Sequence, residues 1–276
     1  MAGKLYVVAT PIGNMGDLSP RAGEVLGSVE VVAAEDTRVT GRLLERIDVR
    51  NKLVSYREEN ERKLAPALVA RLQQGESIAL VSDAGTPGVS DPGYRLVRAA
   101  ADAGIEVVAV PGPSAVVALL SISGLPTDRF SYEGFPPPRA QARRRMLENL
   151  RGAGRTVVFY ESPRRVKAFL DEIAEVLGDP PVAVGRELTK MYEEVLRGTA
   201  AEVAARLAER EPRGEFSIAV HVAAAEQALT GDALDAVVAS MLEEGRSARD
   251  IASALKPRGA GRREVYEAIQ RRSRVT

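Results

Sequence analysis

The chain has 276 residues, no cysteine and one histidine, and its 38 lysines and arginines balance its 38 aspartates and glutamates. The absence of cysteine excludes disulfides, thiolate zinc sites and cysteine nucleophiles, and a single histidine makes a Ser-His-Asp triad or a multi-histidine metal site hard to build. No apolar run reaches the roughly 18–20 residues of a membrane span, and no signal peptide precedes the first strand, so we expect a soluble cytoplasmic protein.

Strand-like apolar runs alternate with helical patterns through the first part of the chain. Strands are predicted at residues 5–9, 29–34, 53–56, 77–81 and 105–110, and helices at 40–47, 59–74 and 94–103, with a small apolar helix that follows the loop at 111–115 and ends at 121. Another helix is predicted from Pro20 with Ser19 as its N-cap, and Asp91-Pro92 is interpreted as a helix start with Asp91 as N-cap. This alternation predicts an α/β fold with a largely parallel, helix-covered sheet.

The alternation pauses at residues 123–128 and then resumes. We therefore predict a first α/β domain of residues 1–122 and a second α/β domain of residues 123–225. Strands of the second domain are predicted at 130–134, 155–160, 182–185 and 216–222. Its helices are predicted at 139–150, in the stretch that ends at residue 177, and at 200–209.

A small helical domain is predicted at residues 226–276, with helices at 233–243, 248–255 and 263–271 and Ser247 as the N-cap of the middle one. From Arg246 onward, nine basic residues face three acidic ones, for a local net charge of +6. The basic residues are Arg246, Arg249, Lys256, Arg258, Arg262, Arg263, Arg271, Arg272 and Arg274. A helix, a turn at Lys256–Gly261 and a basic helix are similar to a helix-turn-helix module, so nucleic-acid contact and a merely solvated tail both remain open.

Polar loops follow several predicted strands, at residues 10–17, 35–38, 82–88, 111–115 and 161–162. The carboxyl ends of parallel strands lie on one edge of a sheet, so we expect these loops to converge on a ligand cleft. In the loop at 82–88, Gly85 and Gly88 allow close backbone approach, and Asp83 can accept bonds from a hydroxyl or ammonium group. A turn that only reverses the chain is the alternative.

Two common nucleotide fingerprints are missing: no G-x-G-x-x-G follows the first strand, and there is no P-loop. Other motifs are present: LYVVATPIGNMGDLSPRA, VVAAEDTR, SYREENE, LVSDAGTPGVSDPG, VVAVPGPSA, YEGFPPPR, VFYESPRRV and GRELTKMYEEVLRGT. With these motifs the chain, from Leu5 to about Ala223, closely resembles the tetrapyrrole-methylase-like (class III) S-adenosylmethionine-dependent methyltransferases. Within that family it is most similar to the branch that methylates small-subunit ribosomal RNA, and its C-terminal helices agree with that branch.

The resemblance implies two α/β domains with S-adenosylmethionine between them, usually in a homodimer. By position, the family's cofactor contacts fall on Pro11, Asp83, Ala84, Gly85, Thr86, Ser114, Ala115, Tyr160, Leu188 and Phe216. Leu188 and Phe216 are suited to form apolar walls for adenine, and backbone N–H groups at Ser114-Ala115 are suited to bind the methionine carboxylate. Asp83 is suited to a ribose hydroxyl or the ammonium group.

The implied reaction is in-line transfer of the sulfonium methyl group to the 2′-oxygen of a cytidine in 16S ribosomal RNA, without a metal. The protein would align the reactants and remove the proton of the 2′-hydroxyl. No histidine is suitably placed to act as the base. The candidate bases are Glu35, Asp36, Glu161 and Lys190, with Asp17 behind them. Alternatively, Asp36 caps the following helix and Glu35 pairs with Arg38.

Arginines along the chain are the candidate RNA contacts: Arg38, Arg139, Arg143, Arg144, Arg145, Arg164, Arg165, Arg262 and Arg263. Tyr132, Phe135 and Tyr160 are suited to stack on an unpaired base. The alternative is that Arg143–Arg145 form an ordinary solvated helix face and that the aromatic residues belong to the core.

Two other functions remain open at this point. One is a tetrapyrrole (precorrin or uroporphyrinogen) C-methyltransferase, which the first loop disfavours because Thr10-Pro11-Ile12-Gly13-Asn14 departs from the glycine signature of those enzymes. The other is a noncatalytic RNA-binding protein that uses the basic C-terminus. The sequence leaves open whether naked RNA or the assembled small subunit is methylated.

Overall fold

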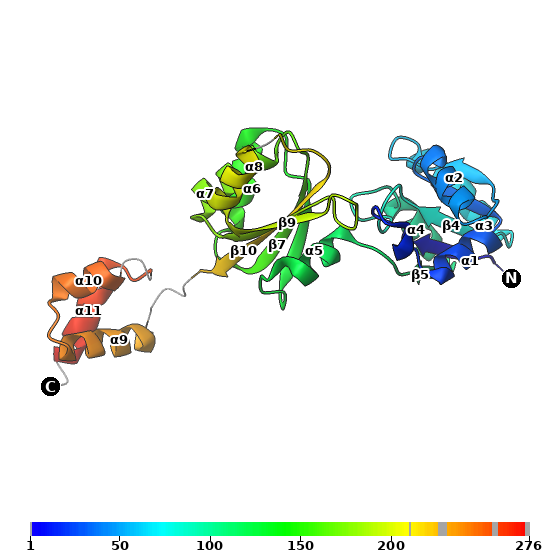
Figure 1. The fold of residues 1–276 in the computed structure, drawn as a ribbon. Coiled ribbons are helices and arrows are strands. Elements are labelled where there is room, and N and C mark those ends of the chain that lie inside the picture. Colours follow the sequence, from blue (N-terminus) through cyan, green and yellow to red (C-terminus); the bar gives the residue numbers. More distant parts are fainter. Residues whose placement is uncertain (1, 210, 226–230, 256–258, 274–276) are drawn as a thin grey trace. The chain divides into compact units, whose positions relative to one another are not determined.

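The computed structural model describes residues 2–209, 211–225, 231–255 and 259–273 (Figure 1). Its residues group into two compact units, one of Met1–Leu150 with Arg155–Val222 and the other of Arg151–Gly154 with Ala223–Thr276. The first unit contains both sheets, and the second contains the C-terminal helices.

The first sheet is entirely parallel in its observed pairings and has the strand order β3-β2-β4-β1-β5. Its strands are β1 (Leu5–Val8), β2 (Val31–Ala34), β3 (Leu53–Ser55), β4 (Ile78–Val81) and β5 (Val107–Val110). The prediction of a helix-covered parallel sheet is confirmed here. Strands β2 and β4 are buried along their whole length, which explains their uninterrupted apolar sequences.

Helices cover both faces of this sheet. On one face, α1 (Pro20–Ser28) and α2 (Thr37–Arg46) pack Leu26 and Leu44 into a cluster with Val8 and Val32. On the other face lie α3 (Glu61–Gln73) and α4 (Tyr94–Asp102), which share a separate core cluster with β1 and β4. A short 3-10 helix, η1 (Met15–Asp17), follows β1. The two faces of the sheet therefore carry separate helix layers and separate core clusters.

The second sheet is mixed rather than parallel and has the order β6-β7-β10-β8-β9. Its elements are β6 (Phe130–Gly134), α6 (Ala140–Leu150), β7 (Ala153–Glu161), α7 (Val166–Leu177), β8 (Pro181–Arg186), β9 (Glu194–Thr199), α8 (Ala200–Ala208) and β10 (Phe216–Ala224). Strand β7 is parallel to β6, whereas β8 is antiparallel to both β9 and β10. Strand β9 was not predicted, because this half-buried edge strand lacks a continuous apolar run.

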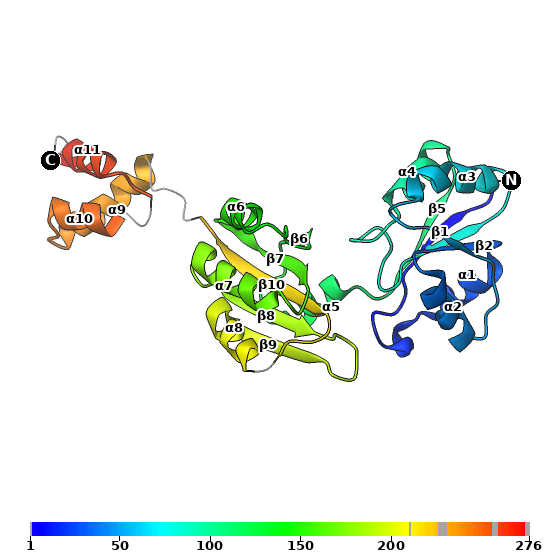
Figure 2. The same cartoon turned by 90° about the horizontal axis from the view of Figure 1, so that it is seen from above.

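Helix α5 (Ala115–Ser123) connects the sheets in the chain but packs against the second one. Its Val116, Leu119 and Leu120 contact Val158 and Ala183 of that sheet. In Figures 1 and 2, α6, α7 and α8 lie on the opposite face of the second sheet from α5. The chain therefore passes from one sheet to the other before α5, ahead of the expected boundary at residue 123.

Of the two N-caps predicted in the first domain, Ser19 is confirmed and Asp91 is not. Ser19 caps α1 by accepting a bond from the backbone N–H of Ala22 at 3.1 Å, as predicted. The predicted helix start at Asp91 is wrong, because α4 begins at Tyr94 with Gly93 as its N-cap. Gly93 has a φ of 153°, and an added Cβ would meet Leu80 Cδ2 at 3.1 Å. The chain therefore turns at this glycine, and Asp91 does not cap α4.

The described part of the second unit contains α9 (Gly231–Glu243), α10 (Ala248–Leu255) and α11 (Arg262–Ser273). They have their own core, which includes Leu234, Ile251 and Val265. The predicted N-cap is confirmed, since Ser247 Oγ accepts a bond from the backbone N–H of Asp250 at 3.2 Å. The predicted domain start at Glu226, the basic residues Lys256, Arg258 and Arg274, and much of the predicted turn lie outside the described residues. No helix in the described ranges is long and apolar enough to cross a membrane.

Candidate active site and nucleic-acid surface

A cavity of about 400 Å³ lies in the first unit and receives residues from both of its sheets. We call it the main cavity. Its lining comprises Ile12, Ala84, Gly85, Thr86, Val89, Ser90, Asp91, Ser114, Ala115, Phe135, Tyr160, Glu161, Ser162, Pro163, Gly214, Glu215, Phe216 and Ser217. Seven of the ten predicted cofactor contacts are in this set: Ala84, Gly85, Thr86, Ser114, Ala115, Tyr160 and Phe216.

Hydrogen bonds hold the loops of the first sheet together at this cavity. Thr10 and Gly85 exchange two backbone bonds, of 2.9 and 3.0 Å, which tie the loop after β1 to the loop after β4. The Thr86 hydroxyl donates to the carbonyl of Pro113 at 3.3 Å, which ties the same loop to the one after β5. The loops that follow β1, β4 and β5 are thus gathered at the carboxyl edge of the parallel sheet, as expected for this topology.

The N-terminus of α5, at Ser114 and Ala115, lines the main cavity. Ser114 is the N-cap but makes no side-chain capping bond, and the first backbone bond of the helix runs from Ala118 N–H to the Ser114 carbonyl at 2.9 Å. The backbone of Val116 interacts with the Tyr160 hydroxyl, whose pKa is raised mainly by burial. A helix N-terminus with free N–H groups favours a negatively charged ligand group.

Glu161 is a buried carboxylate in the wall of the main cavity. Its Oε1 accepts bonds from the backbone N–H of Ser162 at 2.6 Å and from Arg165 Nε at 2.8 Å. Its Oε2 has no hydrogen-bond partner among the residues that the structure describes. A buried carboxylate oxygen that lacks a donor is costly, so this atom is suited to accept a bond from a ligand N–H or O–H group.

Asp91 is a half-buried carboxyl group between the main cavity and a second one of about 370 Å³. The second cavity is called the acidic cavity because Glu35, Glu58, Glu59 and Glu61 also line it. Burial, together with repulsion from Glu35, raises the pKa of Asp91 to about 6. The sequence did not indicate that Asp91 lines a cavity, because Asp-Pro is also a common start of a helix.

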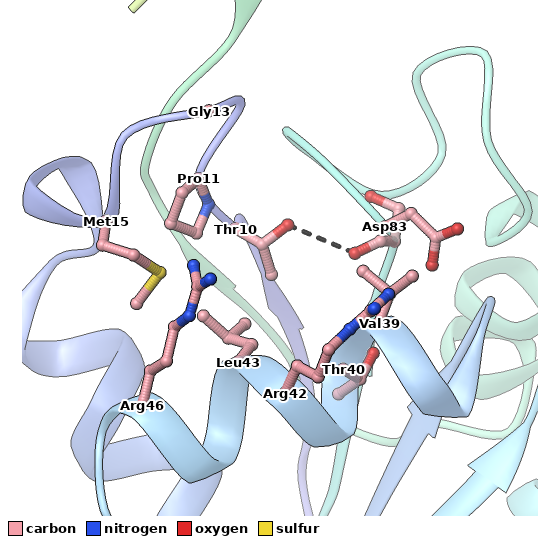
Figure 3. Close-up of a pocket in the computed structure, with 11 residues that line it drawn as sticks. Thr10, Pro11, Gly13, Met15, Val39, Thr40, Arg42, Leu43, Arg46 and Asp83 are labelled. Atoms are coloured by element: carbon pink, nitrogen blue, oxygen red, sulfur yellow. Dashed lines mark hydrogen bonds between the residues drawn. The ribbon is translucent and has the colours of Figure 1, made fainter. Parts of the chain in front are cut away.

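A third cavity, of about 260 Å³, lies on the other side of the same loops and is shown in Figure 3. It is called the α2 cavity because α2 supplies Val39, Thr40, Arg42, Leu43 and Arg46, opposite Thr10, Pro11, Gly13, Met15, Ser82 and Asp83. Two predicted cofactor contacts, Pro11 and Asp83, therefore line the α2 cavity and not the main one. The tenth, Leu188, is 6% exposed and packs in the core cluster of α5.

Three of the four candidate bases, Asp36, Glu161 and Lys190, are engaged in ion pairs. Asp36 caps α2 through the backbone N–H of Arg38 at 2.8 Å and also binds the Arg38 guanidinium, which holds the pKa of Asp36 well below its usual value. Lys190 Nζ lies 3.0 Å from both Glu187 and Glu215. Burial alone would lower the pKa of Lys190, but these two carboxylates raise it. Asp36 and Lys190 both stay charged at neutral pH and are weakly suited to remove a proton.

Glu35 and Asp17 differ from each other in burial. Glu35 lines the acidic cavity and accepts a bond from the backbone N–H of Asp83 at 3.2 Å, and burial raises its pKa. Asp83 in turn accepts a bond from the backbone N–H of Asp36 at 2.9 Å, and its pKa is raised chiefly by partial burial. Asp17 is exposed in η1. Glu35 and Asp83 thus link the loops after β2 and β4.

The predicted RNA-contacting arginines fall into two groups. Arg38, Arg143, Arg144, Arg165 and Arg263 form ion pairs with acidic residues of the chain. Arg139, Arg145 and Arg164 are exposed, and within the described ranges no side-chain ion pair is observed for them. Arg262 lies 5.8 Å from the Tyr266 ring centroid and, with Arg249, lines a cavity of about 440 Å³ in the second unit.

The aromatic residues expected to stack on a base form one cluster. The ring centroids of Tyr132 and Phe135 lie 5.0 and 5.7 Å from that of Tyr160, in edge-on geometry. Phe135 is 57% exposed. The Tyr132 hydroxyl lies 2.6 Å from the hydroxyl of Ser90, which joins this cluster to the loop after β4. An exposed ring beside the main cavity is available for stacking on a planar group.

Arg143 is a structural residue in this arrangement. Its side chain is only 11% exposed, binds both carboxylate oxygens of Glu172 on α7, and donates to the carbonyls of Pro137 and Pro138. We expect Arg143→Ala to lower the free energy of unfolding by about 2–3 kcal/mol, because it leaves a partly buried carboxylate unpaired. Urea denaturation measures this change.

Arg145→Ala is the matched control, since Arg145 is exposed on the same helix. It should change the unfolding free energy by no more than about 0.5 kcal/mol. Equal stability of the two variants would contradict the structural role of Arg143.

No group of three histidine, aspartate or glutamate side chains in the described ranges is placed to hold a metal ion. The site therefore consists of carboxylates, backbone donors and aromatic rings around a cavity.

Comparison with known proteins adds the family. Residues 4–204 match the tetrapyrrole (corrin/porphyrin) methylases. The chain is 50% identical over 229 residues to the ribosomal RNA small subunit methyltransferase I of Xylella fastidiosa, covering 82% of this chain and 84% of that protein. It is 42% identical over 272 residues to the protein of the same name from Synechocystis, covering 96% of each.

Among solved structures, the uroporphyrin-III C-methyl transferase from Thermus thermophilus, complexed with S-adenyl homocysteine, matches with a TM-score of 0.54 and 21% identity. The match covers 79% of this chain and 97% of that one, and it supports the fold alone. Because the family match spans most of the chain and the relatives are matched over most of their length, this chain belongs to the tetrapyrrole methylase family and, within it, to the ribosomal RNA small subunit methyltransferases I.

Proposed function

We propose that this protein uses S-adenosylmethionine to methylate the ribose 2′-hydroxyl of a cytidine in small-subunit (16S) ribosomal RNA. The observation that carries the proposal is the identity of 42–50% to relatives named ribosomal RNA small subunit methyltransferase I, over most of both chains. Membership of the tetrapyrrole methylase family supports the choice of donor. A ribosomal RNA substrate would require the protein to work in the cytoplasm.

The main cavity fits this donor in size and chemistry. Its volume of about 400 Å³ lies within the usual range of roughly 300–1,000 Å³ for small-ligand pockets. The backbone N–H groups of Ser114 and Ala115, at the start of α5, are suited to the carboxylate. The unpaired Oε2 of Glu161 is suited to an ammonium or hydroxyl group, and Phe216 supplies an apolar wall.

When bound, S-adenosylmethionine supplies a methyl group that its sulfonium centre has already activated. The protein must orient the ribose hydroxyl, and such positioning lowers barriers by as much as about 7–11 kcal/mol. Gly85 and Thr86 would shape the wall on which the donor rests. Tyr160 and Phe135 would close the opposite side and exclude water.

Asp91 is the proton acceptor that this arrangement favours. It lines the main cavity, and its pKa of about 6 leaves it ionised yet basic at neutral pH. Glu161 lines the same cavity but is held by Arg165, which favours a binding role. Glu35 stands behind Asp91 in the acidic cavity, where its charge would help to keep the pKa of Asp91 high.

Methyl transfer is tested with labelled S-adenosylmethionine and small ribosomal subunits from cells that lack this protein. We expect label at the 2′-oxygen of a single cytidine, located by nuclease digestion and mass spectrometry. Uroporphyrinogen and protein-free RNA serve as competing substrates. Label in uroporphyrinogen only would favour the tetrapyrrole C-methyltransferase, and RNA binding without donor binding would favour the noncatalytic alternative.

The homodimer implied by the resemblance also remains part of the proposal. Met191 and Tyr192, in the loop between β8 and β9, are 89% and 69% exposed, as is common for apolar residues of an interface. Light scattering after size exclusion measures the mass. A mass of one chain, 29.6 kDa, across the working concentration range would contradict the dimer.

A further inference from the structure

We propose that the α2 cavity binds a phosphodiester group of the RNA strand through Arg42 and Arg46, next to the nucleotide that is methylated. The inference rests on the proposed function, since it assigns the α2 cavity, at the same loops as the main cavity, to the substrate. Neither arginine is among the RNA contacts expected from the sequence.

The two arginines are available for an anion. They lie four residues apart on α2, both are exposed, and both line the α2 cavity. Figure 3 shows their guanidinium groups reaching from the helix toward the loops above it. Arg38, one turn earlier, is bound to Asp36, whereas the described residues provide no observed ion pair to Arg42 or Arg46. Like charges four residues apart on a helix repel each other, and a bound anion would relieve that repulsion.

The α2 cavity is separated from the main cavity by only two loops. In the loop after β1, Pro11 and Gly13 line the α2 cavity while Ile12 lines the main cavity. In the loop after β4, Ser82 and Asp83 face the former, and Ala84 and Gly85 face the latter. The Thr10 hydroxyl, which donates to the Ser82 carbonyl at 3.2 Å, links the loops on the α2 side. A strand whose ribose reaches the main cavity would thus bring a neighbouring phosphate to these arginines.

The chemistry of the α2 cavity fits a phosphodiester. Guanidinium groups bind phosphate oxygens in pairs and stay charged at any working pH. Asp83 is the acidic residue in the lining, and its carboxylate already accepts the backbone N–H of Asp36, so the cations outnumber the anions. The volume of about 260 Å³ is small for a whole cofactor but sufficient for a phosphate with part of its nucleotide.

The test is the double variant Arg42→Gln/Arg46→Gln, with protein-free small-subunit RNA as the binding probe. We expect its affinity for RNA to fall at least about 10-fold and the slope of log affinity against log salt to lessen by about 0.7, the value for one lost phosphate contact on a single strand. The KM for RNA in methyl transfer should rise similarly. The dissociation constant of S-adenosylmethionine, measured by calorimetry, should not change.

Arg62→Gln/Lys63→Gln is the matched control. It removes the same charge from exposed residues of α3, which covers the opposite face of the first sheet. The inference is overturned if the two double variants have the same RNA affinity and salt slope, or if only binding to assembled subunits suffers, because the surface would then contact a protein. If wild-type protein transfers no methyl group, the proposed function fails, while the binding and slope measurements still decide this inference.

Discussion

Replacing Asp91 by asparagine should lower the rate constant of methyl transfer by roughly 10²–10⁴-fold, the usual contribution of a positioned general base. Asparagine has nearly the same shape as aspartate and cannot accept the proton. Because Asp91 has a pKa of about 6 in the folded protein, the wild-type rate should fall as the pH drops below 6. The residual rate of Asp91→Asn should lose that pH dependence. Single-turnover rates measured between pH 5 and 8 provide both results.

Glu35→Gln is the matched control for this prediction. Glu35 lines the same acidic cavity and also has a raised pKa, but it does not line the main cavity. It should keep most of the wild-type rate. A Glu35→Gln variant as slow as Asp91→Asn, or an Asp91→Asn variant as fast as wild type, would rule out Asp91 as the base. If only Glu161→Gln is slow, the base is Glu161.

Asp91→Asn should also change stability in a pH-dependent way. Folding raises the pKa of Asp91 from 3.8 to about 6, so the folded state binds the proton more tightly than the unfolded state does. The resulting stabilisation is complete below pH 3.8 and is lost as the pH rises through 6. The melting temperature of the variant should therefore rise relative to that of the wild-type protein as the pH increases from 4 to 7. Parallel melting curves across this range would mean that Asp91 is not buried as described.

Replacing Gly85 by valine should weaken S-adenosylmethionine binding by roughly 100-fold, equal to about 2.7 kcal/mol. Gly85 lines the main cavity and has a φ of 78°, which a branched side chain adopts only under strain. An added Cβ would lie 3.5 Å from Ile12 Cγ2, so the methyl groups of valine would have to occupy space beside the donor. Isothermal titration calorimetry with S-adenosylmethionine measures the loss directly.

Gly88→Val separates backbone strain from filling of the cavity. Gly88 has a φ of 83° in the same loop, does not line the main cavity, and has no atom within 4 Å of an added Cβ. Its valine variant should suffer similar strain and yet bind the donor with nearly wild-type affinity. Equal losses in both variants would mean that strain in the loop, and not the main cavity, controls binding. Unchanged affinity of Gly85→Val would remove the donor from this cavity.

Local signals in the sequence predicted most elements correctly because they act within a few residues. Ser19 and Ser247 cap the helices that they were expected to cap, and Asp36 caps α2, the alternative weighed against its role as a base. The uninterrupted apolar runs of β2 and β4 indicated strands buried on both faces. Strand β9 was not predicted, because its hydrogen bonding to β8 defines it as a strand more than the hydrophobic pattern of its own residues does.

The sequence by itself determined the alternation of strands and helices, the helix caps and the polar loops at the strand ends, because periodicity and capping depend on neighbouring residues. Only the tertiary structure decided which loop residues share a cavity, separating Asp83 and Pro11 from Ala84 and Ile12. It also decided that Arg143 forms an ion pair with Glu172, 29 residues away, and that burial raises the pKa of Asp91 to about 6. Burial and ion pairing arise between segments distant in sequence, and no local pattern encodes which partner a charged side chain will meet.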